Sequence, residues 1–424
     1  MIRFLFKGMI RDRSRSVLPV IVVSIGVFLT IFMSAYLTGV FGDVIDINAK
    51  FSSGHVKIMT RAYAENKDQI PNDLALMDVS ELKSNLEADY PEVEWVYRTN
   101  FGGLIDVPDE NGETRAQGPA AGRAIDLFSP DSKEVERMNI PNSMVKGEIP
   151  KKPGEAIISD DFAERFHVKI GDKITLFGST MEGSMMFHNF IVSGTIRFGP
   201  ALLDRGAIII DISDAQQILD MEDAASEVLG YFKNGIYDTE KADALKASFN
   251  MKYSSEENEF SPQMFKLEED SGLEEYLKLA DNMSEIMVAF FIIAMSIVLW
   301  NTGLLGGLRR YSEYGIRLAL GEEKKHIFKT IIYEAILIGL FGSVIGTTLG
   351  ISLAYYFQRH GFDFGSILND TTMMFPQIFR TMVKPEHYYI GFIPGLIAVV
   401  FGNALAGIAI YKRKTARLFK ELEV

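Results

Sequence analysis

The chain has 424 residues, 47% of them hydrophobic, no cysteine and a formal net charge of −13. This length is enough for two or three domains. The absence of cysteine excludes disulfides, thiolate metal sites and a cysteine nucleophile, and the acidic balance leaves no basic footprint for nucleic acid, so we exclude nucleic-acid binding.

Residues 1–16 alternate bulky apolar side chains with basic ones. The pattern predicts a cytoplasmic amphipathic helix on the inner membrane surface; a basic flank that only sets the orientation is the alternative. Residues 17–42 form an uncharged apolar run that is long enough to cross a bilayer. The run is longer than the apolar region of a signal peptide, and no small-x-small cleavage site follows it. We therefore predict a retained transmembrane helix.

Residues 43–285 are the acidic part of the chain, with 24 basic and 46 acidic residues. Short strands between turn residues, mixed with helices, predict an α+β domain. We expect a first unit from residues 43–150 and 226–265, a mostly β subdomain at 151–225 and a stalk at 266–285. Strands are expected at 56–59, 93–97, 103–107, 155–159, 173–177, 190–195, 207–211 and 227–232, and helices at 80–89 (capped by Ser80), 160–166, 213–219 and 239–249.

Three further apolar runs predict transmembrane helices at residues 286–308, 327–358 and 388–411. The remaining segments are an inner loop at 309–326, an outer loop at 359–387 and a tail at 412–424. Basic residues are in excess in the N-terminal segment, the inner loop and the tail. The positive-inside rule therefore places all three in the cytoplasm and the acidic domain outside. Four transmembrane helices with both termini inside satisfy this arrangement.

Catalytic signatures are absent from the sequence. No Gly-Lys pair occurs, so the chain has no P-loop, and neither HExxH nor GxSxG is present. The six histidines show no ligand spacing. We therefore predict no catalytic residue, no metal site and no cofactor in this chain, and we interpret the outer carboxylates as a solvated surface.

The inner loop begins RRYSEYGIRLALG at residues 309–321, which reads as an amphipathic charged helix before a break. A short cytoplasmic helix between two membrane spans suits docking into a soluble partner; a plain connecting loop is the alternative. Glu313 and Arg317 are four residues apart and share a helix face, so they can pair with each other or with the partner.

The following span contains one acidic residue and a repeat of glycines. Glu334 lies in its first turns, where an ionisable group is costly, and we expect it to meet Arg309 or Arg310 or to reach the water at the surface. The glycines at 342, 346 and 350 recur every four residues and share one helix face. Such a face allows close approach of another helix, either from a second chain in a dimer or from the same chain.

Segment 307–350 resembles the signature of the FtsX-like permeases, the membrane subunits of the MacB, LolC/LolE and FtsX class of ABC transporters. Two other segments are similar to the family: Lys152–Gly178 resembles part of its outer domain, and the basic tail occupies the place of its closing motif but lacks the proline. The residues that fit the signature are Arg309, Arg310, Glu313, Gly315, Ile316, Arg317, Ala319, Leu320, Gly321, Lys325, Ile327, Glu334, Gly339, Gly342, Gly346 and Gly350.

The resemblance implies an outer domain with a porter-like part (43–150 and 226–265) and a sabre-like part (151–225). It also implies a bacterial inner-membrane permease that pairs with a second permease chain. Each chain would bind a separate ATPase, which holds ATP and Mg²⁺, through a coupling helix at 309–321. Mechanotransmission would then move the outer domains, and Gly339 to Gly350 would serve helix packing.

Three functions are compatible with this resemblance. The first is LolC/LolE-like transport of lipoprotein or other hydrophobic cargo from the outer face of the membrane, with a possible lipoprotein chaperone. The second is MacB-like efflux with a periplasmic adaptor, although MacB usually carries its ATPase on the same chain. The third is FtsX-like signalling to a cell-wall hydrolase, which the long outer domain disfavours. An enzyme with an unrecognised active site is the alternative from another class.

Overall fold

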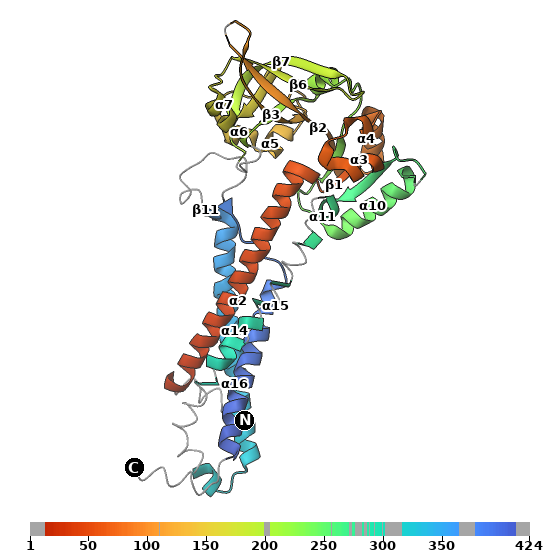
Figure 1. Cartoon of the computed structure of the whole chain (residues 1–424). Helices are drawn as coiled ribbons and strands as arrows, with labels where there is room; N and C mark the ends of the chain where they lie inside the picture. Colours follow the sequence, from red (N-terminus) through yellow and green to blue (C-terminus); the bar gives the residue numbers. More distant parts are fainter. Residues whose placement is uncertain are drawn as a thin grey trace. The chain divides into compact units, whose positions relative to one another are not determined.

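The computed structural model describes residues 13–109, 111–198, 204–255, 257–270, 274–275, 282–283, 286–287, 289–291, 293–298, 300–301, 316–363 and 378–412. The chain divides into two compact units, whose elements are labelled in Figure 1. The helical unit comprises Met1–Asp43, Tyr276–Phe362 and Phe379–Val424. The sheet unit comprises Val44–Glu275 and Asp363–Ile378.

The helical unit is built mainly from long apolar helices. Its described helices include α2 (Arg13–Asn48), α14 (Lys324–His360), α15 (His387–Ile390) and α16 (Phe392–Lys412). Within the described residues, three segments are long and apolar enough to cross a membrane: Val17–Ser53, Lys324–His360 and His387–Leu405. They overlap the first, third and fourth predicted spans (17–42, 327–358 and 388–411), although the first segment continues to Ser53 and the last ends at Leu405.

The second predicted span, 286–308, lies partly outside the described residues. Its described part includes a shorter apolar helix, Ala289–Val298. A total of four transmembrane helices therefore stays a prediction. The expectations for residues 1–12, 364–377 and 413–424, and for much of the stalk, also fall outside the part of the chain that the structure describes.

The sheet unit contains a mixed ten-stranded sheet. The strand order is β10-β1-β9-β2-β3-β8-β5-β7-β4, and β6 pairs with both β2 and β7. The strands are β1 (Val56–Thr60), β2 (Val93–Pro108), β3 (Thr114–Ile125), β4 (Met144–Gly147), β5 (Glu155–Ser159), β6 (Lys173–Ser179), β7 (Met185–Ile196), β8 (Ala207–Asp211), β9 (Glu227–Phe232) and β10 (Pro262–Lys266).

Short helices connect these strands, and several begin at side-chain caps. The Ser159 side chain accepts a hydrogen bond from the Phe162 amide, and Asp238 accepts one from Lys241. Such caps satisfy amide groups that have no partner within the helix. The helices are α3 (Arg61–Asn66), α4 (Val79–Asp89), α5 (Glu134–Arg137), α6 (Ile140–Ser143), α7 (Asp160–Phe166), α9 (Ile212–Ile218), α10 (Thr239–Tyr253) and α11 (Leu267–Asp270).

Strand β2 belongs to two hydrophobic cores. Its first half pairs with β9 and buries Val93 and Trp95 in a core with β1 and α10. Its second half pairs with β3 and β6 and buries Phe101 and Ile105 in a core with β5, β7 and β8. The packing boundary thus lies within β2, whereas the sequence placed the whole of 43–150 with the first unit. The sequence predicted two strands, at 93–97 and 103–107, because the polar residues Arg98, Thr99 and Asn100 follow the first, but the structure has one continuous strand.

The expected cap of α4 is also different in the structure. The helix begins at Val79, and Asp78 precedes it without a side-chain cap bond. Instead, both the amide and the hydroxyl of Ser80 donate hydrogen bonds to Asp223 Oδ1, at 3.0 and 2.5 Å. Ser80 therefore links the first turn of α4 to Asp223, in the loop before β9.

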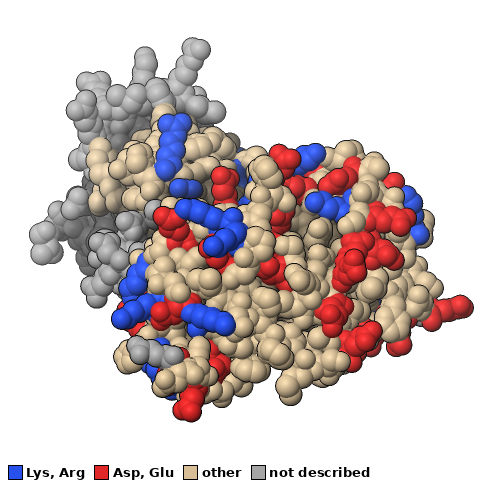
Figure 2. Space-filling view, turned by 90° about the horizontal axis from the view of Figure 1, so that it is seen from above, with Lys and Arg blue, Asp and Glu red and all other residues tan. Residues whose placement is uncertain are grey.

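Figure 2 shows one face of the molecule with its charged side chains. Carboxylates gather over the right half of this face, and basic side chains lie mostly toward the left. The carboxylates seen on this face are exposed, as expected for solvated groups. Others in segment 43–285 are buried, among them Glu134, Asp160 and Glu227, so the interpretation of the outer carboxylates as a solvated surface does not hold for these.

Candidate functional site

The described part of the inner loop forms a helix end closed by Gly321. The Gly321 amide donates to Leu318 O at 3.1 Å, and the Glu322 amide donates to Arg317 O at 3.0 Å. With a φ of +90° at Gly321, these bonds form a Schellman motif, which satisfies carbonyls at a helix C-terminus. The Gly-Glu break seen in the sequence is therefore a defined turn.

An ion pair spans this turn. Arg317 Nε and Nη2 each lie 2.6 Å from a carboxylate oxygen of Glu322, and His326 Nδ1 lies 2.5 Å from Glu322 Oε1. Arg317 thus contacts Glu322. Its predicted pairing, with Glu313 or with the partner, stays a prediction, because Glu313 lies outside the described residues. The hydrogen bonds from Arg317 and His326 lower the pKa of Glu322, so the pair persists at neutral pH.

Two large apolar side chains lie exposed beside this ion pair. Ile316 is 58% exposed and Leu320 is 82% exposed, and their spacing of four residues puts them on one helix face. The other predicted coupling residues, Arg309, Arg310, Glu313 and Gly315, lie outside the described residues. Glu334 is half-buried in the third turn of α14, and its expected arginine partners lie outside the described residues as well.

The glycine face of α14 packs against α2 of the same chain. A Cβ built at Gly342 would lie 2.6 Å from Val23 Cβ, one at Gly346 would lie 2.6 Å from Ser24 O, and one at Gly350 would lie 3.1 Å from Ile31 Cβ. Gly339 instead faces α16, with Leu396 Cδ2 at 3.1 Å from its built Cβ. Of the two partners left open by the sequence, the structure thus places a helix of the same chain on this face.

The C-terminal end of α2 is held inside the sheet unit. The π-helical turn η1 (Ala49–Ser53) follows α2 directly. The carbonyls at a helix C-terminus have no partners within the helix. Here Ala49 O accepts hydrogen bonds from the Gly54 amide at 2.9 Å and also from Tyr231 Oη at 3.0 Å, and Lys50 O accepts one from Arg98 Nη2 at 2.9 Å.

The next carbonyl, Phe51 O, accepts hydrogen bonds from both Arg98 and Arg123. Two guanidinium groups therefore face the negative end of the helix dipole, where cations are stabilising. We call this arrangement the helix anchor; its residues are Arg98, Arg123, Tyr231 and η1.

A buried carboxylate balances one of these cations. Arg98 and Glu134 are 1% and 0% exposed, and Arg98 Nε lies 2.6 Å from Glu134 Oε2. Arg137 also pairs with Glu134, and with Glu94 at 2.7 Å. Burial alone would raise the pKa of Glu134, but the charges of Arg98 and Arg137 outweigh it and hold the pKa below its usual value. The glutamate is therefore ionised in the folded domain.

The helix anchor was not predicted from the sequence. Its arginines belong to strands β2 and β3, and they lie far along the chain from the helix that they contact. The available signal was weak: each arginine interrupts an otherwise uncharged stretch of its strand. A buried arginine needs a partner, but the sequence does not show that this partner is a helix end.

His55 follows the helix anchor and is a buried, uncharged acceptor. It is 3% exposed, and its Nδ1 accepts a hydrogen bond from the Phe232 amide at 3.0 Å. Burial lowers its pKa from 6.5 to about 4. As pH falls below 6.5, the unfolded chain binds a proton at His55 that the folded chain does not bind until the pH nears 4. The free energy of unfolding therefore falls as pH falls from about 6.5 to about 4, and it is highest above that range.

We expect the sheet unit to lose about 2 kcal/mol of stability through His55 between pH 7.5 and 4.5. The measurement is denaturant unfolding of the full chain at both pH values, followed by the fluorescence of the buried Trp95 after Trp300→Phe. His55→Asn keeps a hydrogen-bond acceptor but does not titrate. Its loss of stability between pH 7.5 and 4.5 should therefore be about 2 kcal/mol smaller than that of the wild type. Equal losses in the two proteins would show that His55 is not the group responsible.

Two protein families match successive parts of the chain. The family described as MacB-like periplasmic core domain matches residues 16–248, and the family described as FtsX-like permease C-terminal matches residues 285–415. The helix anchor lies within the first match, and the described inner loop and the glycine face of α14 lie within the second. Each unit is thus matched over part of its residues, and 249–284 lie outside both matches.

Individual relatives are distant. An uncharacterized ABC transporter permease protein of Mycobacterium tuberculosis is 22% identical over 205 residues, which are 48% of this chain and 22% of that protein. The chain thus spans about a fifth of the length of this curated relative. The periplasmic region of MacB from Actinobacillus actinomycetemcomitans aligns with 53% of this chain and 92% of its own, at 8% identity and a TM-score of 0.35.

Proposed function

Because this chain belongs to the MacB-like periplasmic core domain family and is an ABC transporter permease of the FtsX/MacB type, we propose that it couples ATP hydrolysis by a separate ATPase to movement of its periplasmic domain. The chain itself is the non-catalytic subunit, and ATP and Mg²⁺ bind to the ATPase. It resides in a bacterial inner membrane with both termini in the cytoplasm, in accordance with the positive-inside rule.

The exposed apolar face of the inner loop carries this proposal. Ile316 and Leu320 present two aliphatic side chains to solvent beside the fixed Arg317–Glu322 pair. Helices that dock into a partner groove use apolar anchors with this spacing and a polar rim. Burial of each such side chain stabilises a complex by about 1.5–3 kcal/mol. The segment therefore offers the ATPase a compact docking element.

A helix without interruption supports transmission across the membrane. α2 begins at Arg13 in the helical unit and ends at Asn48 in the sheet unit. The turn η1 continues α2, and its carbonyls Ala49 O and Lys50 O are held by Tyr231 and Arg98. A displacement of α2 along its axis would thus pull directly on β2 and β3, the strands that supply the two arginines.

Exposed apolar residues on the sheet favour a hydrophobic cargo over a polar one. Leu104, Phe177 and Phe187 are opposite one another on β2, β6 and β7 and are 41%, 37% and 69% exposed. Opposite residues on adjacent strands share a face, so the three form one apolar row. We propose that this row receives lipoprotein or other lipidic cargo, as in the LolC/LolE type. We also propose that two permease chains pair. Because α2 of the same chain packs on Gly342, Gly346 and Gly350, the contact between the two chains lies on another surface.

Leu320→Asp should weaken the association of the permease with its ATPase at least about tenfold, because it removes an apolar anchor and adds a charge that burial would have to desolvate. The measurement is ATPase affinity and ATP hydrolysis in the reconstituted complex. Met251→Asp is the matched control, since Met251 is 88% exposed but lies in α10 of the sheet unit. Wild-type affinity in Leu320→Asp would mean that the ATPase docks elsewhere.

A further inference from the structure

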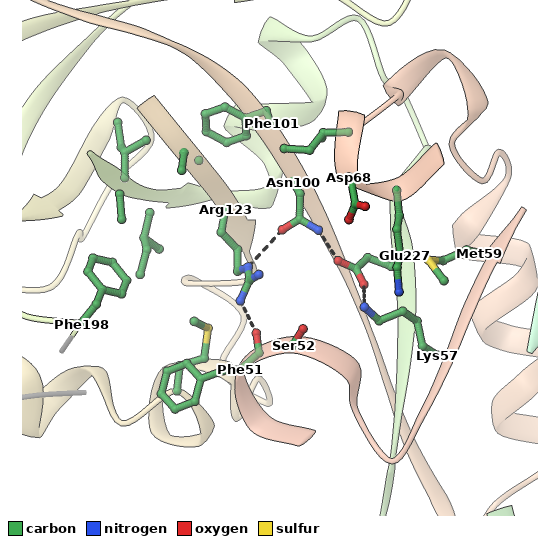
Figure 3. A pocket seen from close by; sticks show the side chains of 18 of the residues that line it. Phe51, Ser52, Lys57, Met59, Asp68, Asn100, Phe101, Arg123, Phe198 and Glu227 are labelled. Carbon is green, nitrogen blue, oxygen red and sulfur yellow. Dashed lines mark hydrogen bonds and ion pairs between the residues drawn. The ribbon is translucent and has the colours of Figure 1, made fainter. Parts of the chain in front are cut away.

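The sheet unit contains a pocket of about 460 Å³ beside the helix anchor. Its lining includes Lys57 of β1, Asn100 of β2, Arg123 of β3 and Phe51 of η1, which Figure 3 labels. Ligand pockets of small organic molecules have volumes of about 300–1,000 Å³. The pocket is therefore large enough to hold such a molecule.

One wall carries a connected set of polar side chains. Arg123 Nε donates to Asn100 Oδ1 at 3.1 Å, Asn100 Nδ2 donates to Glu227 Oε1, and Lys57 forms an ion pair with Glu227 (Figure 3). Lys57 and Glu227 are 5% and 3% exposed. Lys57 and Glu227 neutralise each other, and Lys67 and Asp68, which also line the pocket, carry opposite charges. The net charge of the lining therefore corresponds to that of Arg123.

Arg98 bonds directly to a carboxylate, whereas Arg123 makes no direct bond to a carboxylate of the described residues and interacts with Glu227 and Glu134 only at longer range. Its hydrogen-bond acceptors among the described residues are neutral, namely Asn100 Oδ1 and Phe51 O. Burial and the adjacent charge of Arg98 lower the pKa of Arg123, but a guanidinium stays protonated in proteins. Two of its five N–H groups are used by these bonds, which leaves three donors for a ligand.

Another wall of the pocket is apolar. Met138, Phe198 and Ile209 belong to it, lie in one hydrophobic core and are each at most 6% exposed. Their burial fixes the shape of this wall, because close-packed side chains have little freedom to move. An apolar ligand body would find a preformed surface there.

We propose that this pocket binds a small organic anion, whose carboxylate, phosphate or sulfonate group pairs with Arg123 and whose apolar body lies against Phe198 and Met138. A planar guanidinium with free donors binds such oxyanions through two parallel hydrogen bonds. The proposal does not rest on ATPase coupling. Acyl carboxylates derived from lipid and compact water-soluble anions share this chemistry.

The experiment measures binding of 2-naphthoate and its neutral analogue 2-naphthamide to the full chain in nanodiscs, by calorimetry. Empty nanodiscs provide the correction for partitioning into lipid. Arg123→Gln should weaken naphthoate binding about tenfold or more, because a charge-assisted hydrogen bond is lost. It should leave the weaker binding of naphthamide unchanged. Arg115→Gln is the matched control, since Arg115 lies on the same strand, is exposed and does not line the pocket.

A second variant tests the location without altering the helix anchor. Ala121 is exposed and lines the pocket, so Ala121→Phe should fill the space and abolish binding of both compounds in a folded protein. Competition of naphthoate with octanoate and with phenyl phosphate then separates an acyl ligand from a compact one. Naphthoate binding that survives Ala121→Phe, or equal affinities of naphthoate and naphthamide for the wild type, would overturn the proposal.

Discussion

Arg98→Met is expected to lower the free energy of unfolding of the sheet unit by about 3–5 kcal/mol, the range for breaking a buried ion pair from one side. The substitution leaves the fully buried Glu134 with Arg137 but without its second cation, and it removes the Arg98 donors to Lys50 O and Phe51 O. Denaturant unfolding followed by Trp95 fluorescence measures the loss. A change below about 1 kcal/mol would contradict this account, since the surrounding groups would then not need the guanidinium.

The double variant Arg98→Met, Glu134→Leu separates stability from anchoring. Replacement of both buried charges by apolar groups is often neutral, and Arg137 retains Glu94 as a partner. We therefore expect stability to return toward the wild-type value. The end of α2 should still lack the Arg98 donors, so amide hydrogen exchange in residues 45–53 should remain faster than in the wild type. Restored protection in this variant would show that Arg98 does not hold the helix.

The sequence predicted those helices and strands whose ends are marked by residues within a few positions of them. Charged flanks marked the ends of the apolar runs, and α14 extends to Lys324 and His360, three residues before and two after the expected span. β5, α7, β8 and β9 have the expected bounds. In each of these strands, residues with high β-propensity lie between turn or cap residues, so the pattern is complete within a few positions.

Strand β3 shows why other elements could not be predicted. Its sequence, TRAQGPAAGRAI, is rich in Gly and Ala and contains Pro119, which argues against a strand. The structure resolves each objection through distant residues. Pro119 lies before Ala121, where pairing with β8 begins, and a Cβ at Gly122 would lie 1.9 Å from the Phe101 ring. The small residues of β3 are thus accommodated because the neighbouring Phe101 ring and strand β8 pack directly against them and leave no space for larger side chains.

The functional residues divide in the same way. The inner loop could be proposed as a docking element from sequence because its charges and apolar residues are adjacent there, and its role stays a prediction. The helix anchor and the pocket combine residues that lie up to about 180 positions apart, as in the bond between Tyr231 and Ala49 O. Side-chain chemistry in the sequence does not reveal such pairings, since an arginine in a strand pattern has many possible acceptors.

Gly346→Leu is expected to destabilise the helical unit itself, by about 3 kcal/mol or more, at the upper end of overpacking effects. A Cβ at this position would lie 2.6 Å from Ser24 O and 2.8 Å from Val27 Cβ. The first of these atoms is backbone, so α2 and α14 must separate to admit any side chain. Loss of this close contact removes the packing that associates small-residue helix faces in membranes.

Titration of the full chain with SDS in mixed micelles measures this effect, and two matched variants define its cause. Val344→Leu enlarges a side chain that is 53% exposed on the same helix and should be neutral. Gly339→Ala meets the mobile end of Leu396 at 3.1 Å and should cost less than Gly346→Ala. If Gly346→Leu instead retained wild-type resistance to SDS and only dissociated paired permeases, the glycine face would be a contact between two chains. The packing of α2 on α14 within one chain predicts the opposite: the fold of the chain weakens first, and any loss of pairing follows from it.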